Sequence, residues 1–160
     1  FIPVNTPLLN GNEKRYLIDC IDTGWISSSG DYINKFESEF AKSVNRKHAI
    51  SVSNGSCALD ITFLSLNLKK GDEVIAPTFT IISCISAIIR ANATPVLVDA
   101  SSLDWNMDLD IVEKSITKNT KAILVVHIYG FPVNMDKVES LAKKYSLTII
   151  EDAGINRGRI

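Results

Sequence analysis

The sequence predicts an α/β fold with a mostly parallel sheet and helices on both of its faces. Short apolar runs alternate along the chain with segments whose apolar residues recur at helical spacing, which is typical of strand and helix units. The chain has 160 residues, of which 46% are hydrophobic and 22% are charged, so it can bury one core. We therefore expect residues 1–160 to form a single α/β domain. The expected strands are 48–52, 73–76, 95–98, 121–127 and 147–151.

The N-terminal part is expected to begin with two amphipathic helices. Asn10 and Glu13 have the spacing of a capping box, and Gly24 is a helix-ending residue, which predicts a helix over about 11–23. After the first expected strand, a turn at 53–56 leads into a third helix. The second helix is predicted from apolar residues at helical spacing, which are Ile33, Phe36, Phe40 and Val44.

Three further helices are expected between the remaining strands. Helices are predicted from about 80 to 92 and from about 108 to 116, and Asn134 is placed to cap the last one. This alternation continues without a repeat, a linker or a low-complexity tract, and it predicts a sheet covered on both faces. The apolar residues of the last helix lie at helical spacing, and they are Val138, Leu141, Ala142 and Tyr145.

Charge and cysteine content exclude several classes of protein. The 17 basic and 18 acidic residues are scattered along the chain, which argues against a nucleic acid partner and against a membrane surface. The longest uncharged run, 74–89, is interrupted by Pro77, so neither a signal peptide nor a membrane-spanning helix is expected. Cys20, Cys57 and Cys84 fit neither a disulfide framework nor a zinc site, so we expect no metal and a cytoplasmic location.

A polar turn follows the first expected strand at Asn54-Gly55-Ser56. Glycine permits a close approach of the backbone, and a helix start offers amides and a hydroxyl to an anion. The alternative is an ordinary turn into a helix with Ser56 as its cap. The turn is neither a Walker A loop nor the three-glycine dinucleotide motif.

Three other polar clusters follow expected strands. The cluster 77–80 has two interpretations. The aromatic ring of Phe79 is available to stack on a ligand, or a threonine caps the next helix and Phe79 lies in the core. His127 is expected to be a hydrogen-bonded structural residue rather than a base or a metal ligand. Glu151 and Asp152 end a largely apolar strand, and burial of a carboxylate costs free energy, so one of them should have a cationic partner.

These clusters, taken in order, carry a resemblance to a known family. The chain resembles the N-terminal part of the sugar aminotransferases of the DegT or StrS family, which are fold-type I enzymes that use pyridoxal phosphate. Members that aminate a GDP-linked 4-keto-6-deoxy sugar are the most similar. The resemblance implies an incomplete cofactor-binding large domain without the small C-terminal domain. The matching stretches are 25–28, 52–59, 71–75, 77–80, 93–96, 127–130 and 151–153.

The resemblance implies a role for five residues in binding pyridoxal phosphate. Gly55 and Ser56 match the pair that holds the cofactor phosphate, and Asp152 matches the aspartate that pairs with the pyridine nitrogen. Ile81 stands where relatives have an aromatic residue stacked on the ring. Ile155 stands where relatives have a polar residue bonded to the ring hydroxyl.

The resemblance also implies that no catalytic residue lies in this chain. The family's Schiff-base lysine lies tens of residues beyond the aspartate, and none of the lysines present has the expected context. The chain alone is therefore expected not to turn over.

Two functions from different classes follow from these observations. The first is a pyridoxal-phosphate aminotransferase, homo-oligomeric, that moves an amino group from glutamate to a nucleotide-linked 4-keto-6-deoxy sugar. The second is a non-catalytic truncated relative that binds a phosphate or nucleotide ligand, or a partner subunit. A third, an unrelated doubly wound nucleotide binder, is disfavoured by the absence of both glycine-rich motifs.

Overall fold

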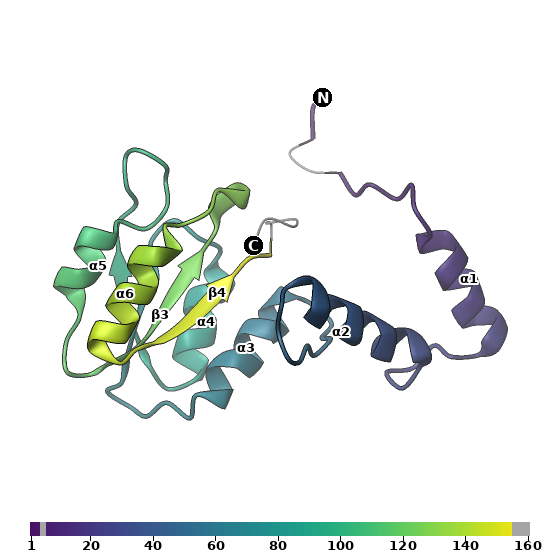
Figure 1. Cartoon of the computed structure of the whole chain (residues 1–160), viewed down its shortest axis with the longest axis horizontal. Helices are drawn as coiled ribbons and strands as arrows, with labels where there is room; N and C mark the ends of the chain where they lie inside the picture. The colour runs from purple at the N-terminus through teal and green to yellow at the C-terminus, as the bar shows by residue number, and fades with distance from the viewer. Residues whose placement is uncertain (4–5, 155–160) are drawn as a thin grey trace. The chain divides into compact units, whose positions relative to one another are not determined.

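The computed structural model describes residues 1–3 and 6–154 and divides the chain into two compact units (Figure 1). The first unit contains residues 1–51 and the second contains residues 52–160. The organisation of the whole chain as one domain stays a prediction.

The first unit consists of two helices joined by a loop, α1 (Glu13–Thr23) and α2 (Asp31–Ser43). Gly24 ends α1 in the left-handed conformation with a φ of 73°, as predicted. The predicted capping box is wrong, because the helix begins after Asn12 and no side chain caps it. The Glu13 carboxylate accepts a hydrogen bond from the amide of Gly11 at 2.9 Å instead.

Residues 48–52 do not form the predicted strand. A strand exists only where a neighbour completes its hydrogen-bond ladder, and none of the described strands pairs with this segment. The Ser51 amide and hydroxyl donate instead to the Glu37 carboxylate of α2, at 2.8 and 2.9 Å. These two hydrogen bonds lower the pKa of Glu37. Ile50, which contributed to the strand prediction, is 76% exposed.

The second unit contains a four-stranded sheet in which every pair of neighbours is parallel, as predicted. The strand order is β2-β1-β3-β4, so two strands lie in the interior and two at the edges. Four of the five predicted strands are therefore confirmed. Their bounds are β1 (Glu73–Pro77), β2 (Thr94–Val98), β3 (Thr120–Val126) and β4 (Thr148–Asp152).

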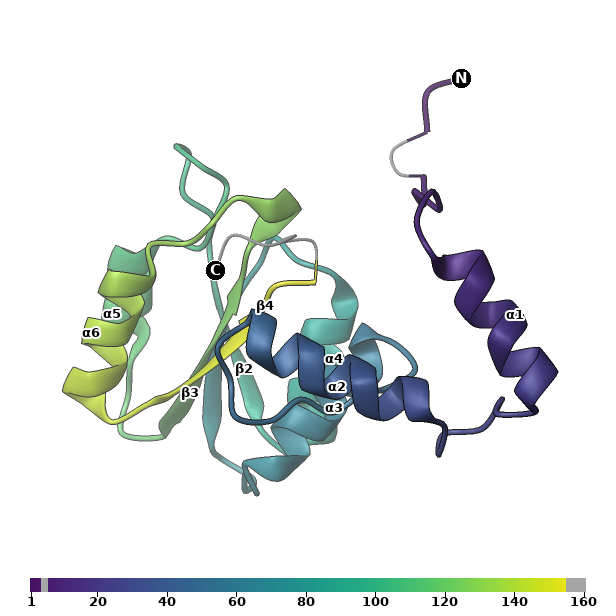
Figure 2. The ribbon, with the colours of Figure 1, turned by 45° about the vertical axis from the view of Figure 1, so that its right-hand side comes forward.

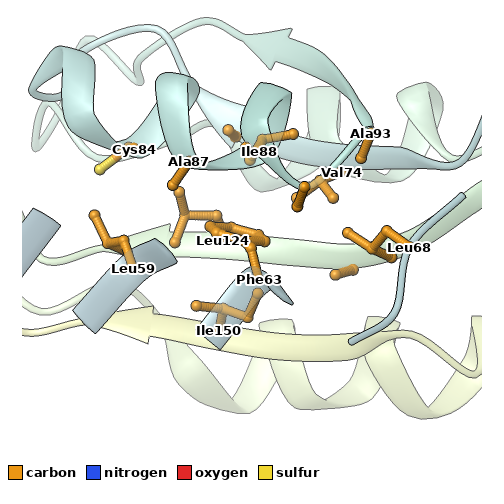
Figure 3. Close-up of a cluster of buried hydrophobic side chains, with 13 residues drawn as sticks. Leu59, Phe63, Leu68, Val74, Cys84, Ala87, Ile88, Ala93, Leu124 and Ile150 are labelled. Atoms are coloured by element: carbon orange, nitrogen blue, oxygen red, sulfur yellow. The ribbon is translucent and has the colours of Figure 1, made fainter. Parts of the chain in front are cut away.

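Helices cover both faces of this sheet, as the sequence predicts (Figure 2). The helices α3 (Gly55–Ser65) and α4 (Ile82–Arg90) pack on one face, and α5 (Leu109–Ser115) and α6 (Met135–Tyr145) pack on the other. Successive strand residues point to opposite faces, so Val74 joins the first cluster and Ile75 joins the second. Figure 3 shows the first cluster, with side chains from α3 and α4 meeting those of β1, β3 and β4.

Side chains cap three of these helices where the chain leaves a strand or loop. Asn54 accepts from the amide of Cys57 at 2.9 Å, and Asn134 accepts from the amide of Lys137 at 3.1 Å, as predicted for Asn134. Asp108 caps α5 in the same way. Ser56 is therefore not the cap of α3, because Asn54 already fills that position.

We expect Phe63→Ala to lower the free energy of unfolding by about 3–5 kcal/mol. Phe63 is fully buried between α3 and the sheet, so the substitution leaves a cavity (Figure 3). Leu64→Ala is the matched control, because Leu64 is the next residue of the same helix and is 62% exposed. Urea unfolding followed by circular dichroism measures both, and equal losses would contradict the assigned core.

Candidate functional site

The start of α4 is hydrogen-bonded to two of the residues singled out from the sequence. The hydroxyl of Ser56, in the first turn of α3, donates to the hydroxyl of Ser83 at 2.9 Å. The thiol of Cys84, the next residue along, donates to the carboxylate of Asp152 at the end of β4, at 3.5 Å. Ser56 and Asp152 therefore lie at the same edge of the sheet, as predicted, and one helix turn connects them.

The N-terminus of α3 has backbone donors available to an anion. Its cap, Asn54, uses the Cys57 amide with its side chain and the Ala58 amide with its carbonyl oxygen. Among the described residues the amides of Gly55 and Ser56 have no protein acceptor. A Cβ added at Gly55 would meet no atom within 4 Å, so the space beside these amides is open. Two amides at the positive end of a helix dipole, with the Ser56 hydroxyl, suit a phosphate group.

Asp152 has neutral hydrogen-bond donors around its carboxylate. It is half-buried, and its Oδ1 accepts from the amide of Gly154 at 3.1 Å while its Oδ2 accepts from Cys84. In the part of the chain that the structure describes, no cation lies within ion-pair distance of Asp152. A half-buried carboxylate without a cation is favourably placed to hold a proton on a basic ring nitrogen.

The thiol of Cys84 stays protonated at neutral pH. Burial raises its pKa to about 11, and the negative charge of Asp152 also raises it. Because the thiol hydrogen is donated to Asp152, the Thr80 hydroxyl is the donor in the 3.2 Å contact with Sγ. Sequence reasoning missed this network. The spacing of four residues between Thr80 and Cys84, at a helix start, is the only local signal of it.

The carboxylate of Glu151 is bonded to His127 rather than to a cation. His127 is 3% exposed, and its Nδ1 accepts from the amide of Val133 at 3.1 Å, so that nitrogen carries no proton. Its Nε2 therefore donates to Glu151 at 2.9 Å, and the imidazole is neutral. The predicted structural role of His127 is confirmed. The sequence predicts a cationic partner for one of Glu151 and Asp152, and among the described residues neither carboxylate is paired with a lysine or an arginine.

Ile81 lies at the start of α4 and is exposed to solvent. It occupies the N-cap position without a capping side chain, and 61% of its surface is exposed. Neither Thr78 nor Thr80 caps this helix, and Phe79 is 37% exposed, so the alternative of a cap with Phe79 in the core is wrong. The remaining candidate, Ile155, lies outside the described residues.

The described residues contain neither a membrane-spanning helix nor a cluster of metal-ligating side chains. No helix in residues 1–3 and 6–154 combines the length and apolar character needed to cross a bilayer. The same residues contain no group of three or more His, Cys, Asp or Glu side chains arranged to hold a metal ion.

The fold and the site define a class of protein. A parallel sheet that brings an open helix N-terminus and a strand-end carboxylate to one edge is typical of proteins that bind a phosphate-bearing ligand there. The chain belongs to the DegT/DnrJ/EryC1/StrS aminotransferase family, whose sequence profile matches residues 7–158. The resemblance inferred from the sequence motifs is thereby confirmed.

Three relatives illustrate the similarity. The chain is 46% identical over 152 residues to the GDP-perosamine synthase of Escherichia coli O157:H7, a match that covers 95% of the chain and 42% of the relative. The aminotransferase from Psychrobacter cryohalolentis is 32% identical with a TM-score of 0.89, over 98% of the chain and 40% of that structure. NtdA from Bacillus subtilis, solved with bound PMP, is 33% identical with a TM-score of 0.85, over 91% of the chain and 33% of that structure.

These matches confirm the predicted similarity to perosamine synthetases and to the N-terminal part of a fold-type I large domain. The chain spans about two-fifths of the length of the curated relative.

Cys84 is expected to make the stability of the chain fall at alkaline pH. Its folded-state pKa is about 11, above its ordinary value of 9.0, so the folded state holds the proton more tightly than the unfolded state. The contribution is complete below pH 9.0 and is lost as the pH rises towards about 11. Urea unfolding at about pH 8 and about pH 10.5 measures the free energy of unfolding of the wild type and of Cys84→Ala. The difference between the two free energies should be smaller at the higher pH.

Asp152→Asn provides the companion measurement. Removing the negative charge lowers the folded-state pKa of Cys84 towards its ordinary value, so the alkaline loss of stability should be smaller than in the wild type and complete at a lower pH. If the difference in the free energy of unfolding between the wild type and Cys84→Ala did not change with pH, the assignment of a buried thiol beside Asp152 would be wrong.

Proposed function

We propose that this chain is the cofactor-binding part of a pyridoxal-phosphate aminotransferase that moves an amino group from glutamate to a nucleotide-linked 4-keto-6-deoxy sugar. The observation that carries the proposal is that Ser56 and Asp152 are hydrogen-bonded to two consecutive residues in the first turn of α4. Ser56 is bonded to Ser83, and Asp152 is bonded to Cys84. The E. coli relative named GDP-perosamine synthase and the NtdA structure with bound PMP support the substrate class and the cofactor.

The residues present fit pyridoxal phosphate. The amides of Gly55 and Ser56 and the Ser56 hydroxyl would bind the phosphate, since the space beside Gly55 is open. The Asp152 carboxylate would hold a proton on the pyridine nitrogen, because no cation among the described residues competes for it. Ile81 presents an exposed apolar side chain at the same helix start, with no aromatic face for stacking. When bound, the cofactor supplies an electron sink for the carbon that loses its proton.

The chain by itself is proposed to lack turnover. The side chains described above bind, orient and hold a proton, but an amine that can move a proton between substrate and cofactor is needed as well. No lysine is hydrogen-bonded or ion-paired to Ser56, Cys84 or Asp152 in the described part of the chain. The non-catalytic alternative, a relative that binds only a phosphate ligand or a partner subunit, rests on the same observation.

Pyridoxal phosphate is expected to bind the chain saturably and reversibly. Asp152→Asn should weaken binding by roughly 10- to 100-fold, because a hydrogen bond to a charged group contributes about 1.5–3 kcal/mol. Ser56→Ala should weaken it by about tenfold through loss of one hydrogen bond to the phosphate, which is charged. Absorbance titration measures both affinities. The controls are Glu139→Gln on α6 and Ser65→Ala at the other end of α3, which should bind as the wild type does.

Borohydride reduction followed by mass spectrometry separates the remaining outcomes. A single reduced adduct on one lysine would overturn the claim that the catalytic amine is absent. The absence of saturable binding in the wild type would overturn the cofactor proposal and favour the non-catalytic alternative.

Self-association and a cytoplasmic location complete the proposal. The two helices of the first unit leave large apolar side chains exposed, among them Leu17 at 65%, Ile21 at 70% and Phe36 at 55%. Apolar surface of this kind is typical of an interface, and homo-oligomers commonly bury it against a second copy. The three cysteines are free, as in a reducing compartment.

The wild type is expected to sediment as an oligomer at tens of micromolar, and Leu17→Asp with Ile21→Asp should shift it towards the monomer. The charged side chains would have to be desolvated at the interface. Lys14→Glu on the same helix is the control for a change of charge alone. A monodisperse wild-type monomer in analytical ultracentrifugation would contradict the proposal.

A further inference from the structure

Three side chains form a hydrogen-bond network that ends on the Asp152 carboxylate. The Thr80 hydroxyl donates to Sγ of Cys84 at 3.2 Å, and the Cys84 thiol donates to Oδ2 of Asp152 at 3.5 Å. Thr80 precedes α4, Cys84 lies in the first turn of that helix, and Asp152 is the last residue of β4. The network therefore joins a helix start to a strand end that lies 68 residues beyond Cys84 in the sequence.

The hydrogen bonds of this network all run in one direction. An ionised carboxylate only accepts hydrogen bonds, so the thiol hydrogen lies towards Asp152. Because burial raises the pKa of Cys84 to about 11, the thiol keeps this hydrogen at neutral pH. The sulfur is then the acceptor for the Thr80 hydroxyl. A group that accepts one hydrogen bond while donating another is polarised, and its own donation becomes stronger, so Thr80 strengthens the bond from Cys84 to Asp152.

Packing of the core holds the sulfur of Cys84 in place. Cys84 is fully buried and belongs to the same cluster as Ala87 and Ile88 of α4, as Figure 3 shows. A side chain in a close-packed core keeps one rotamer, so the thiol makes its hydrogen bond from a fixed point. The Asp152 side chain is only half-buried, and packing alone restricts it less. The order of the core is thus passed through one hydrogen bond to a carboxylate at the edge of the sheet.

The second oxygen of the Asp152 carboxylate has a different partner. Oδ1 accepts from the amide of Gly154 at 3.1 Å, while Oδ2 accepts from Cys84. One donor on each oxygen defines the plane of the carboxylate, and each oxygen can still accept a further hydrogen bond. Both donors are neutral, and among the described residues no cation offsets the negative charge. The carboxylate is therefore oriented in advance for an N–H donor that carries positive charge.

We propose that Cys84 is a positioning residue that orients Asp152 towards the ring nitrogen of pyridoxal phosphate, and that Thr80 supports it through the sulfur. The inference rests on the proposed function, in which Asp152 holds a proton on that nitrogen. Thr80 and Cys84 act only through Asp152. Their contribution is to fix the carboxylate before the cofactor arrives, so that less rotational freedom is lost on binding.

The affinity for pyridoxal phosphate, measured by absorbance titration, tests whether Cys84 acts through Asp152. Cys84→Ala should weaken binding by about 3- to 10-fold, because the carboxylate must then be ordered on binding. Thr80→Val keeps the branched shape without the hydroxyl and should weaken binding by about twofold. When Asp152→Asn is already present, Cys84→Ala should have no further effect on the affinity. An equal loss of affinity with and without Asp152→Asn would overturn the proposal.

The S–H stretching band of Cys84 gives a readout that packing alone would not change. Donation of the hydrogen weakens the S–H bond and lowers its stretching frequency. Cys20→Ala combined with Cys57→Ala leaves Cys84 as the single cysteine, so that infrared spectroscopy isolates its band. Asp152→Asn should raise the frequency, because a neutral amide is a weaker acceptor than a carboxylate. Pyridoxal phosphate should raise it as well, since a charged N–H on the same carboxylate competes with the thiol. A band that the cofactor does not shift would overturn the proposal.

Two further variants separate the hydrogen bond from the packing of Cys84. Cys84→Val fills the same space without a donor and should weaken binding of pyridoxal phosphate as much as Cys84→Ala does. If Cys84→Val bound the cofactor as the wild type does, the loss in Cys84→Ala would be due to its cavity, and the proposal would be wrong. Ser86→Ala is the matched control, because it removes a hydroxyl two residues further along α4, and it should bind as the wild type does.

The same titrations separate this inference from the proposed function. Saturable binding of pyridoxal phosphate that depends on Asp152 but is unchanged in both Cys84→Ala and Cys84→Val would overturn the positioning role alone. The absence of saturable binding to the wild type would overturn the proposed function and the positioning role together.

Discussion

Burial of the two central strands on both faces is the constraint on which the second unit depends. Residues 74–76 of β1 and 122–125 of β3 are buried, so helices must cover both faces. Parallel neighbours are then joined by crossovers, and every strand ends at the same edge. Polar side chains cannot enter the interior without losing hydration, but at this edge they reach solvent and one another. The candidate site lies at this edge of the sheet, where side chains are no longer buried between the helices and the strands.

Helix α4 connects the parts of this edge. Its inner face is anchored in the core by Cys84, Ala87 and Ile88, and its first turn bonds Ser56 through Ser83 and Asp152 through Cys84. A thiol is a weak donor, so it orients the Asp152 carboxylate without satisfying it as an ammonium or guanidinium group would. The carboxylate keeps most of its capacity for a ligand, while packing of the same cysteine keeps it in place.

Strand β4 separates two carboxylates that are adjacent in sequence. Glu151 is bonded to the buried, neutral His127, and Asp152 is bonded to the thiol of Cys84. Successive residues of a strand point to opposite faces, so one carboxylate belongs to the framework of the unit and the other to the site. The desolvation of each carboxylate is therefore offset by a different hydrogen bond, and neither bond comes from a cation among the described residues.

Local periodicity in the sequence determined four of the strands, the helices between them, the end of α1 at Gly24 and the cap at Asn134, because each depends on residues close in the chain. It failed for 48–52, where an apolar run resembles a strand but no neighbour completes a ladder. Only the tertiary structure decided that Cys84 contacts Asp152, 68 residues away, and that Trp105 and Tyr129 share a cavity with Phe79. The order of strands in a sheet is set by the packing of the whole unit, and no short-range pattern encodes which loops will meet at its edge.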